Sequence, residues 1–247
     1  MKLPVTTGLL FIFIFSILPV KSVLAQSTPD DSLLYNKAVS HLVNLYHQSA
    51  GDQSGLFNGS QYGGYPFSFT EGNPFFREDK PGFGSVIYDG VLYEKLRMQF
   101  DEVKDVLFTQ DSARRIQLLN ERIDRFTLFN NNFIRIVKDT ENTVLIRTGF
   151  YNLLYEGNTS LLKKEEKHIR EDVSSGELRR FIDVSEYYYL KKNNLYYAVK
   201  SKRNLLDIFN DRKKDIKQFI AKNKLSYRKD KQNMLTQTTA YYDQLIK

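Results

Sequence analysis

Hydrophobic and polar residues alternate along the middle of the chain, from Ser85 to Tyr155. Leu96, Met98 and Phe100 are separated by polar residues, and this period of two places the three side chains on one face of a strand. Similar apolar runs recur at intervals of about 8 to 12 residues, with turn-forming residues between them and no helical period. The pattern predicts an antiparallel meander of short strands on which the other segments pack.

Two tight turns are predicted within this β-rich pattern. Asp89-Gly90 stands between the apolar residues 86–88 and 91–93, and the dipeptide favours a two-residue hairpin because both of its positions accept positive φ. Residues 187–190 and 195–199 flank a second turn, and they predict the last hairpin of the sheet.

A charged stretch, residues 163–177, interrupts the strand pattern. It shows no clear period, so we expect it to be irregular or to form a short helix. Within it, Glu165 and His168 have the i, i+3 spacing that some helical metal sites use. A single pair at this spacing is a weak signal, so no metal site is predicted here.

Helical periods flank the predicted sheet on both sides. Residues 30–49 carry apolar side chains, including Leu42, at the spacing of one helix face. Three more helices are predicted near the C-terminus: Ser201 and Asp211 are good N-caps for the first two, and the third begins near Lys229. The predicted fold is therefore α+β, a mainly antiparallel β meander with an N-terminal helix and a C-terminal helical segment.

The first residues of the chain have the pattern of a targeting segment. A short basic start, an apolar run and small residues before position 26 predict that residues 1–25 are a secretory signal cleaved between Ala25 and Gln26. The alternative, an uncleaved membrane anchor, would need a longer apolar run. We expect a periplasmic or secreted chain without a transmembrane segment, in which residues 26–200 form one domain and the basic segment 201–247 packs on it.

The amino-acid composition narrows the chemistry. The chain contains no cysteine, which excludes thiol catalysis, disulfides and cysteine-based metal sites. His41, His47 and His168 are its three histidines, and none lies in a known catalytic motif. No catalytic residue, metal site or cofactor is predicted, so we expect a non-enzymatic protein. The enzyme alternative is a hydrolase in which one of these histidines meets a carboxylate in space.

Positive charge is concentrated near the C-terminus. The formal net charge is +7, and the residues from Lys191 to Lys231 include 14 Lys or Arg but only four Asp. An exported chain is not expected to meet nucleic acid, so the candidate partners are an unknown envelope protein or an anionic lipid or lipopolysaccharide surface. The alternative is a solvated helix face without a ligand. The candidate binding residues are Arg212, Lys213, Lys214, Lys217, Lys222, Lys224, Arg228, Lys229 and Lys231.

Glycine and aromatic residues gather before the predicted sheet. Residues 51–90 hold nine of the chain's 13 glycines together with many Phe and Tyr residues, which predicts a loop-rich layer over the sheet. Loops of this composition can bind flat ligands or can pack their own rings. The candidate loop residues for ligand binding are Phe57, Tyr62, Tyr65 and Phe67.

Several short motifs give the chain a resemblance to known proteins. The motifs are Leu56-Phe57-Asn58-Gly59, Tyr62, Tyr65, Tyr88-Asp89-Gly90-Val91-Leu92-Tyr93, Val199-Lys200-Ser201-Lys202 and Tyr241-Tyr242-Asp243. On these residues the chain resembles small exported proteins of Bacteroidota-type bacteria, a group without an assigned activity. The resemblance implies export and a shared fold, and it implies no catalytic residue.

Two binding functions remain open from the sequence. The favoured one is a non-enzymatic cell-envelope protein that binds a protein partner or an anionic surface. The other is a periplasmic carrier or chaperone for an apolar ligand such as lipid or lipoprotein. A carrier of this kind predicts an open, dry concavity, which would be lined by Leu96, Met98, Phe100 and Phe126.

Overall fold

A computed structural model describes residues 55–110, 114–138, 146–174 and 176–246, together with Tyr35, Lys37–Val39, His41, Leu42 and Leu45. The contacts within the chain separate Met1–Ala38 from Val39–Lys247, and the sheet and the C-terminal helices all belong to the second part. The predicted signal segment, residues 1–25, lies outside the described residues, as does His47.

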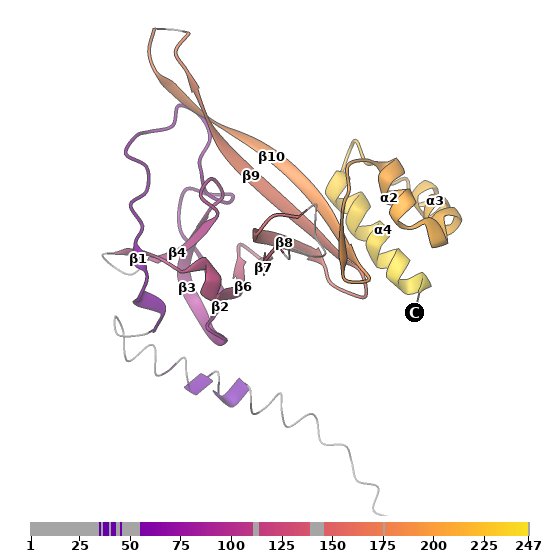
Figure 1. The fold of residues 1–247 in the computed structure, drawn as a ribbon, viewed down its shortest axis with the longest axis horizontal. Helices are drawn as coiled ribbons and strands as arrows, with labels where there is room; N and C mark the ends of the chain where they lie inside the picture. Colours follow the sequence, from indigo (N-terminus) through magenta and orange to yellow (C-terminus); the bar gives the residue numbers. More distant parts are fainter. Residues whose placement is uncertain are drawn as a thin grey trace, which may run out of the picture. The chain divides into compact units, whose positions relative to one another are not determined.

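Eleven strands form one antiparallel sheet (Figure 1). In chain order the strands are β1 (Ser60–Gln61), β2 (Gly82–Tyr88), β3 (Val91–Asp101), β4 (Val106–Gln110), β5 (Arg115–Gln117), β6 (Ile123–Leu128), β7 (Asn131–Ile136), β8 (Gly149–Tyr155), β9 (Ser160–Asp172), β10 (Arg179–Lys192) and β11 (Leu195–Ala198). Short 3-10 turns lie at η2 (Gly55–Phe57) and η3 (Asn120–Arg122).

The order of the strands across the sheet is β1-β5-β4-β3-β2-β6-β7-β8-β9-β10-β11. From β2 near the centre, the chain builds one half of the sheet outward to β5, and then returns to place β6 on the other side of β2. The short strand β1, which precedes β2 in the chain, pairs with β5 at the edge, and β7 to β11 follow in sequence. The predicted fold class, an antiparallel α+β meander, is confirmed, with two departures: β2 lies between β3 and β6, and β1 lies beside β5.

Turn chemistry explains the two predicted hairpins. Asp89 and Gly90 have φ values of 51° and 74° and join β2 to β3. Positive φ at both central positions is the geometry whose twist matches the twist of the flanking strands. Asn193 and Asn194, with φ values of 51° and 61°, play the same part between β10 and β11. Both hairpins are confirmed.

The prediction for residues 163–177 was wrong, because β9 continues as a strand to Asp172 and pairs with β10 along most of that length. Two of its lysines, Lys164 and Lys167, are buried in the structure. Their charges are matched by carboxylates from a segment some 60 residues earlier in the chain, so the local sequence reads as polar although much of the strand lies inside.

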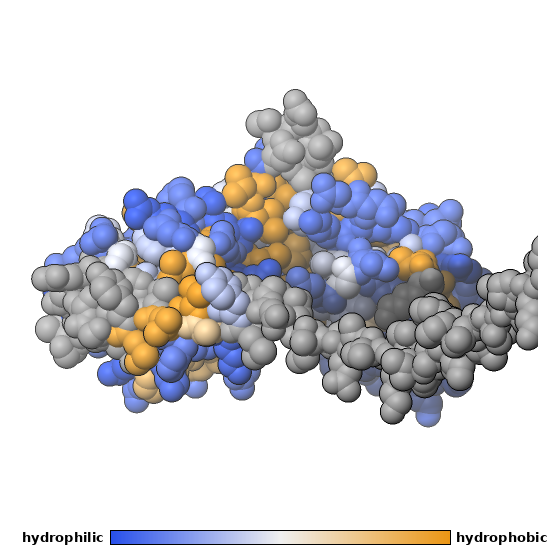
Figure 2. All heavy atoms as spheres, turned by 90° about the horizontal axis from the view of Figure 1, so that it is seen from below, coloured by the Kyte–Doolittle hydropathy of each residue, from blue (hydrophilic) through white to orange (hydrophobic). Residues whose placement is uncertain are grey.

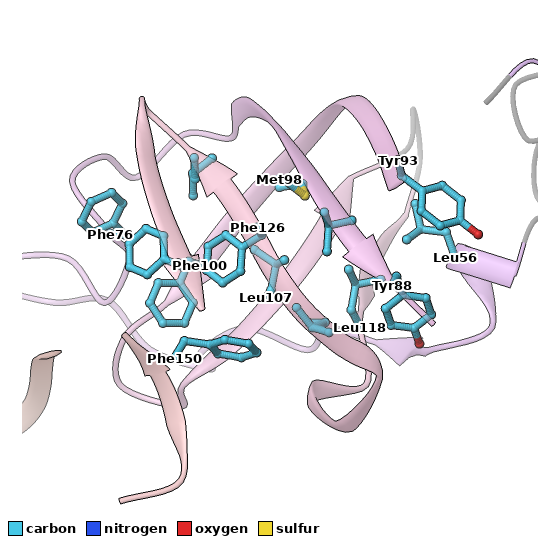
Figure 3. Close-up of a cluster of buried hydrophobic side chains, with 14 residues drawn as sticks. Leu56, Phe76, Tyr88, Tyr93, Met98, Phe100, Leu107, Leu118, Phe126 and Phe150 are labelled. Carbon is cyan, nitrogen blue, oxygen red and sulfur yellow. The ribbon is translucent and has the colours of Figure 1, made fainter. Parts of the chain in front are cut away.

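Strands β2, β3, β4 and β6 enclose an aromatic core. Figure 3 shows the labelled side chains of β2, β3, β4 and β6 pointing toward one another in the space that these strands surround. Phe126 stacks on Phe133 with ring centroids 4.6 Å apart, and Phe100 meets both rings at 5.3 Å. Met98 is also fully buried in this cluster, and Leu96 packs against it. These side chains therefore fill a core and do not line an open concavity.

The N-terminal helix lies where it was predicted, since the described residues between Tyr35 and Leu45 all have helical backbone. Two residues of its expected apolar face are exposed: Leu42 is 65% exposed and Leu45 is 48% exposed. Helical spacing alone therefore did not establish burial for this segment.

Three helices follow the sheet: α2 (Lys202–Ile208), α3 (Lys213–Lys222) and α4 (Lys231–Leu245), with a 3-10 turn η4 (Asn210–Arg212) before α3. The Ser201 hydroxyl accepts a hydrogen bond from the Asn204 N–H, which confirms Ser201 as the N-cap of α2. The cap predicted at Asp211 was wrong, because α3 begins two residues later with no side-chain cap. Asp211 instead accepts hydrogen bonds from Lys192 and from the Tyr242 hydroxyl.

The C-terminal helices differ in the elements that they contact. Helix α4 contacts β8 and β9, while α3 contacts α4 and α2 (Figure 1). A second core fills the space between them, in which Phe209 and Tyr242 stack with centroids 4.1 Å apart. In the described residues, every helix is too short or too polar to traverse a bilayer.

Candidate functional site

A group of buried charges joins the β3–β4 turn to β9. We name Glu102, Asp105, Lys164 and Lys167 the charged junction. The Lys167 Nζ lies 3.1 Å from Glu102 Oε2 and also donates to the Phe75 carbonyl. The Lys164 Nζ donates to Asp105 and, at 3.0 Å, to the Phe150 carbonyl. Each buried cation is therefore held both by a carboxylate and by a main-chain oxygen.

Glu102 has the most perturbed carboxyl group of this junction. Burial raises its pKa to about 7, and the nearby charge of Glu165 adds to the increase, while Lys167 opposes it. The side chain is 1% exposed, and its Oε2 makes no hydrogen bond of good geometry despite the short distance to Lys167. A raised carboxyl pKa is a common property of catalytic acids.

The space around Glu102 decides against catalysis there. The cavity that Glu102 lines with Lys163 and Glu165 has a volume of about 10 Å³, which is roughly the room that one water needs. Its other walls are Asn152 and aromatic rings of the first core. No substrate could reach the carboxyl group in this arrangement, so the charged junction holds the two halves of the sheet together.

The loop candidates are mostly engaged in packing. The Tyr62 hydroxyl donates to Asp101 at 2.7 Å and its ring stacks on Phe108 with centroids 4.0 Å apart. The Tyr65 hydroxyl donates to the same carboxylate at 2.9 Å, and Lys104 lies over its ring. These contacts anchor the loop to the end of β3. The side chain of Phe57 lies outside the described residues.

Phe67 belongs to a second contact of this loop. The Arg180 guanidinium lies 4.1 Å from the centre of the Phe67 ring, and the next residues of the loop reach the edge of β10. There the Thr70 N–H donates to the Arg180 carbonyl, and the Ile182 N–H donates to Glu71. Phe67 is half-buried and remains accessible on one side.

The histidines do not form a site within the described chain. His168 is exposed on β9, with Nε2 3.9 Å from Glu166, and His41 is also exposed. Glu165, which has the i, i+3 spacing to His168 in the sequence, forms an ion pair of 3.0 Å with Lys163. Among the residues that the structure describes, no group of three acidic or histidine side chains could hold a metal ion.

The nine basic candidates divide into two groups. Lys213 forms an ion pair of 2.7 Å with Asp207, and Lys231 lies over the rings of Tyr188 and Tyr227. The other seven are exposed, and within the described part of the chain they form no ion pair. We name these seven the basic face: Arg212, Lys214, Lys217, Lys222, Lys224, Arg228 and Lys229.

Three of these cations lie on α3. Ile216 and Ile220 form the buried side of this helix, and Lys214, Lys217 and Lys222 are spread over its exposed side. Helix α3 packs on α4 and α2 through the buried side, which leaves the three lysines exposed to solvent. Figure 2 shows one face of the molecule, on which hydrophilic residues predominate and hydrophobic residues gather in patches.

A groove of about 400 Å³ lies close to the basic face in sequence and structure. We name it the tyrosine groove; its lining comes from residues 186–189 of β10, residues 198–200 at the end of β11 and just after it, Tyr227 and Lys231. The Tyr227 hydroxyl donates to the Val199 carbonyl and the Tyr188 hydroxyl donates to Glu186, both at 3.3 Å. Burial raises the pKa of Tyr188 to about 12, so its hydroxyl keeps its proton at neutral pH. Sequence reasoning missed this groove, because its walls come from three separate segments.

Another groove, of about 360 Å³, lies on β6 to β11. Its lining mixes acidic and basic side chains, such as Asp124, Arg125 and Glu156, with apolar ones such as Leu153. This balance of charges selects no particular ligand class.

Comparison of the chain with models of protein families, with curated proteins and with solved structures returns no match.

Proposed function

We propose that this chain is an exported, non-enzymatic binding protein of the cell envelope, which docks on an acidic partner protein through its basic face. Export rests on the sequence pattern that ends at Ala25, and docking rests on the arrangement of charge. The observation that carries the proposal is the exposed side of α3, where Lys214, Lys217 and Lys222 form no ion pair with any residue that the structure describes.

The energetics favour a binding surface over a stabilising one. Exposed cations without partners contribute little to folding, and several like charges on one helix side repel one another weakly. Clustered cations instead attract an acidic surface and accelerate encounter, with a strong dependence on ionic strength. An anionic lipid surface would attract the same cations and is a separate outcome of the test.

The carrier function is supported by no specific observation. The four side chains expected to line its concavity are Leu96, Met98, Phe100 and Phe126, and they pack within the first core. The cavity beside that core, at about 10 Å³, has no room for an acyl chain.

The test compares two variants with the same change in net charge. One replaces Lys214, Lys217 and Lys222 with Gln. The control replaces Lys80, Lys95 and Lys138, which are equally exposed but lie outside the helices, with Gln. Each mature protein is cross-linked in envelope extracts at low and high salt, and each is also mixed with phosphatidylglycerol vesicles.

We expect the helix variant to lose at least tenfold of its salt-sensitive association with an acidic protein, while the control variant keeps it. Equal association of both variants would contradict the proposal. Binding to the vesicles that depends on the same three lysines, with no protein captured, would replace the protein partner by a lipid surface.

A further inference from the structure

The outer edge of β10 is only partly paired. Strand β11 pairs with residues 189–192 of β10, and the Thr70–Glu71 segment contacts it near Phe181 (Figure 1). The edge between these two neighbours extends from Ile182 to Tyr188. At about 3.3 Å per residue this stretch is roughly 20 Å long, enough for an additional strand of four or five residues.

The alternation of main-chain groups identifies what this edge offers. The Ile182 N–H donates to Glu71 and the Tyr188 carbonyl accepts from the Val199 N–H, so both residues direct their main chain outward. In an antiparallel strand every second residue does so. Val184 and Glu186 therefore direct an N–H and a C=O each toward the same edge. Within the described part of the chain, no residue pairs with these groups on that side.

The side chains of this edge do not block an incoming strand. Proteins commonly protect open edges with lysine, proline or a bulge. Here Val184 is 52% exposed and Tyr187 is 42% exposed. The two carboxylates of the stretch are occupied by the neighbouring strand: Asp183 pairs with Arg170 at 2.9 Å and Glu186 pairs with Lys163 at 2.6 Å.

The tyrosine groove continues this edge at its C-terminal end. Glu186 and Tyr188 face the helices, where Lys231 lies, and Tyr187 and Tyr189 face the opposite side of the sheet. An added strand would thus present alternate side chains to a cationic wall and to an aromatic wall. This is the arrangement by which strand addition obtains affinity from the main chain and specificity from the side chains.

We propose that the β10 edge and the tyrosine groove together bind an extended, acidic peptide segment by strand addition. The inference rests on the proposed role in partner binding and names a second surface for it. Charge selects an acidic segment, because Lys200 and Lys231 line the groove, while Glu186 in the same lining is paired with Lys163, and Arg228 and Lys229 flank the groove in the chain. A second copy of this chain fits poorly, since it carries a net charge of +7 and would bring the same cations together.

The probe is a displayed library of random ten-residue peptides, selected on the full mature chain and resynthesised with a fluorescent label. The first variant is Val184→Pro, which removes one outward N–H from the edge. The second is Val184→Lys, which keeps the strand intact and places a charge on the edge. The matched control is Val173→Lys, a change at a valine that is 67% exposed and lies beyond the end of β9.

We expect selected peptides with alternating acidic and β-branched or aromatic residues. Their affinity should fall at least tenfold in Val184→Pro and in Val184→Lys, remain unchanged in Val173→Lys, and fall several-fold in Lys231→Gln. Methylation of alternate peptide nitrogens should abolish binding. Failure to select a peptide, or selected peptides that bind the two Val184 variants as tightly as wild type, would overturn the proposal.

Two further experiments distinguish strand addition from binding through the basic face and from dimerisation. The variant with Gln at positions 214, 217 and 222 should still bind the peptides, so a failure of the basic face leaves the edge testable on its own. Sedimentation of the unliganded chain checks the other possible occupant. A dimer that Val184→Pro dissociates would assign the edge to a second copy and overturn the peptide proposal.

Discussion

The charged junction and the basic face place the same residue type in opposite environments. Lys164 and Lys167 are buried, and each touches a carboxylate and a main-chain carbonyl. Lys214 and Lys217 are exposed and have no ion-pair partner in the described part of the chain. Removing the first pair should damage the fold, and removing the second should damage only association. Burial and partners therefore decide what a lysine does, and its sequence neighbours do not.

The largest expected effect is on the buried side of this comparison. Lys167→Met keeps most of the side-chain volume but leaves Glu102 buried without its cation, which should cost about 3–5 kcal/mol of unfolding free energy. The control is Lys217→Met, which should change the free energy of unfolding by less than about 0.5 kcal/mol. Urea unfolding at about pH 8 measures both.

A small loss in Lys167→Met would mean that Glu102 has taken up a proton or reached water. Equal losses in both variants would remove the distinction between the two regions.

A second effect concerns the pH dependence of stability. Burial raises the pKa of Glu102 to about 7 from an ordinary value of 4.5, so the folded state binds this proton more tightly than the unfolded state. The contribution of Glu102 to stability is therefore fully present below about pH 4.5 and is lost as the pH rises through 7. The total change is on the order of 3 kcal/mol.

Glu102→Gln should remove this pH dependence. The variant should become more stable relative to wild type as the pH rises from about 5 to about 8, because only wild type loses the contribution of Glu102. Urea unfolding at several pH values within that interval measures the slope. A constant difference across the interval would show that Glu102 titrates normally.

The smallest effect tests the loop that precedes the sheet. Tyr65→Phe removes one of the donors to Asp101 and should cost about 1 kcal/mol, because Asp101 keeps its bonds to Tyr62 and to the main chain. The control, Tyr187→Phe, alters a more exposed tyrosine and should cost nothing measurable. Thermal unfolding compares the two. No loss in Tyr65→Phe would return Tyr65 to the candidates for ligand binding.

Much of the sheet could be predicted from the sequence because its determinants are local. The Asp89-Gly90 turn, the alternation around Met98 and the Ser201 cap all depend on residues within a few positions of each other. Strand β9 could not be predicted in this way. Its buried Lys164 has its partner at Asp105, and no local rule assigns a partner at that distance.

The candidate sites divide along the same line. The basic face was visible as a concentration of Lys and Arg, and the structure added which of them lie on one side of α3. The tyrosine groove could not be predicted, because Tyr188, Tyr227 and Lys231 come together only when Lys231, at the start of α4, reaches Tyr188 on β10. The open edge of β10 likewise depends on where β11 stops, which is a tertiary property.

The position of β2 between β3 and β6 has a consequence for how the chain folds. Eight of the ten strand pairs join consecutive strands, so each forms by closing a short connection. The pairing of Gly84 with Leu128 is different, because it must bring together residues on either side of three intervening strands. The pairing of β2 with β6, that of β1 with β5 and the contact of Glu71 with Phe181 all close long stretches of chain, so their loop-closure entropy opposes folding more than that of the hairpins. We expect each half of the sheet to form early from local hairpins and these long-range pairings to form late.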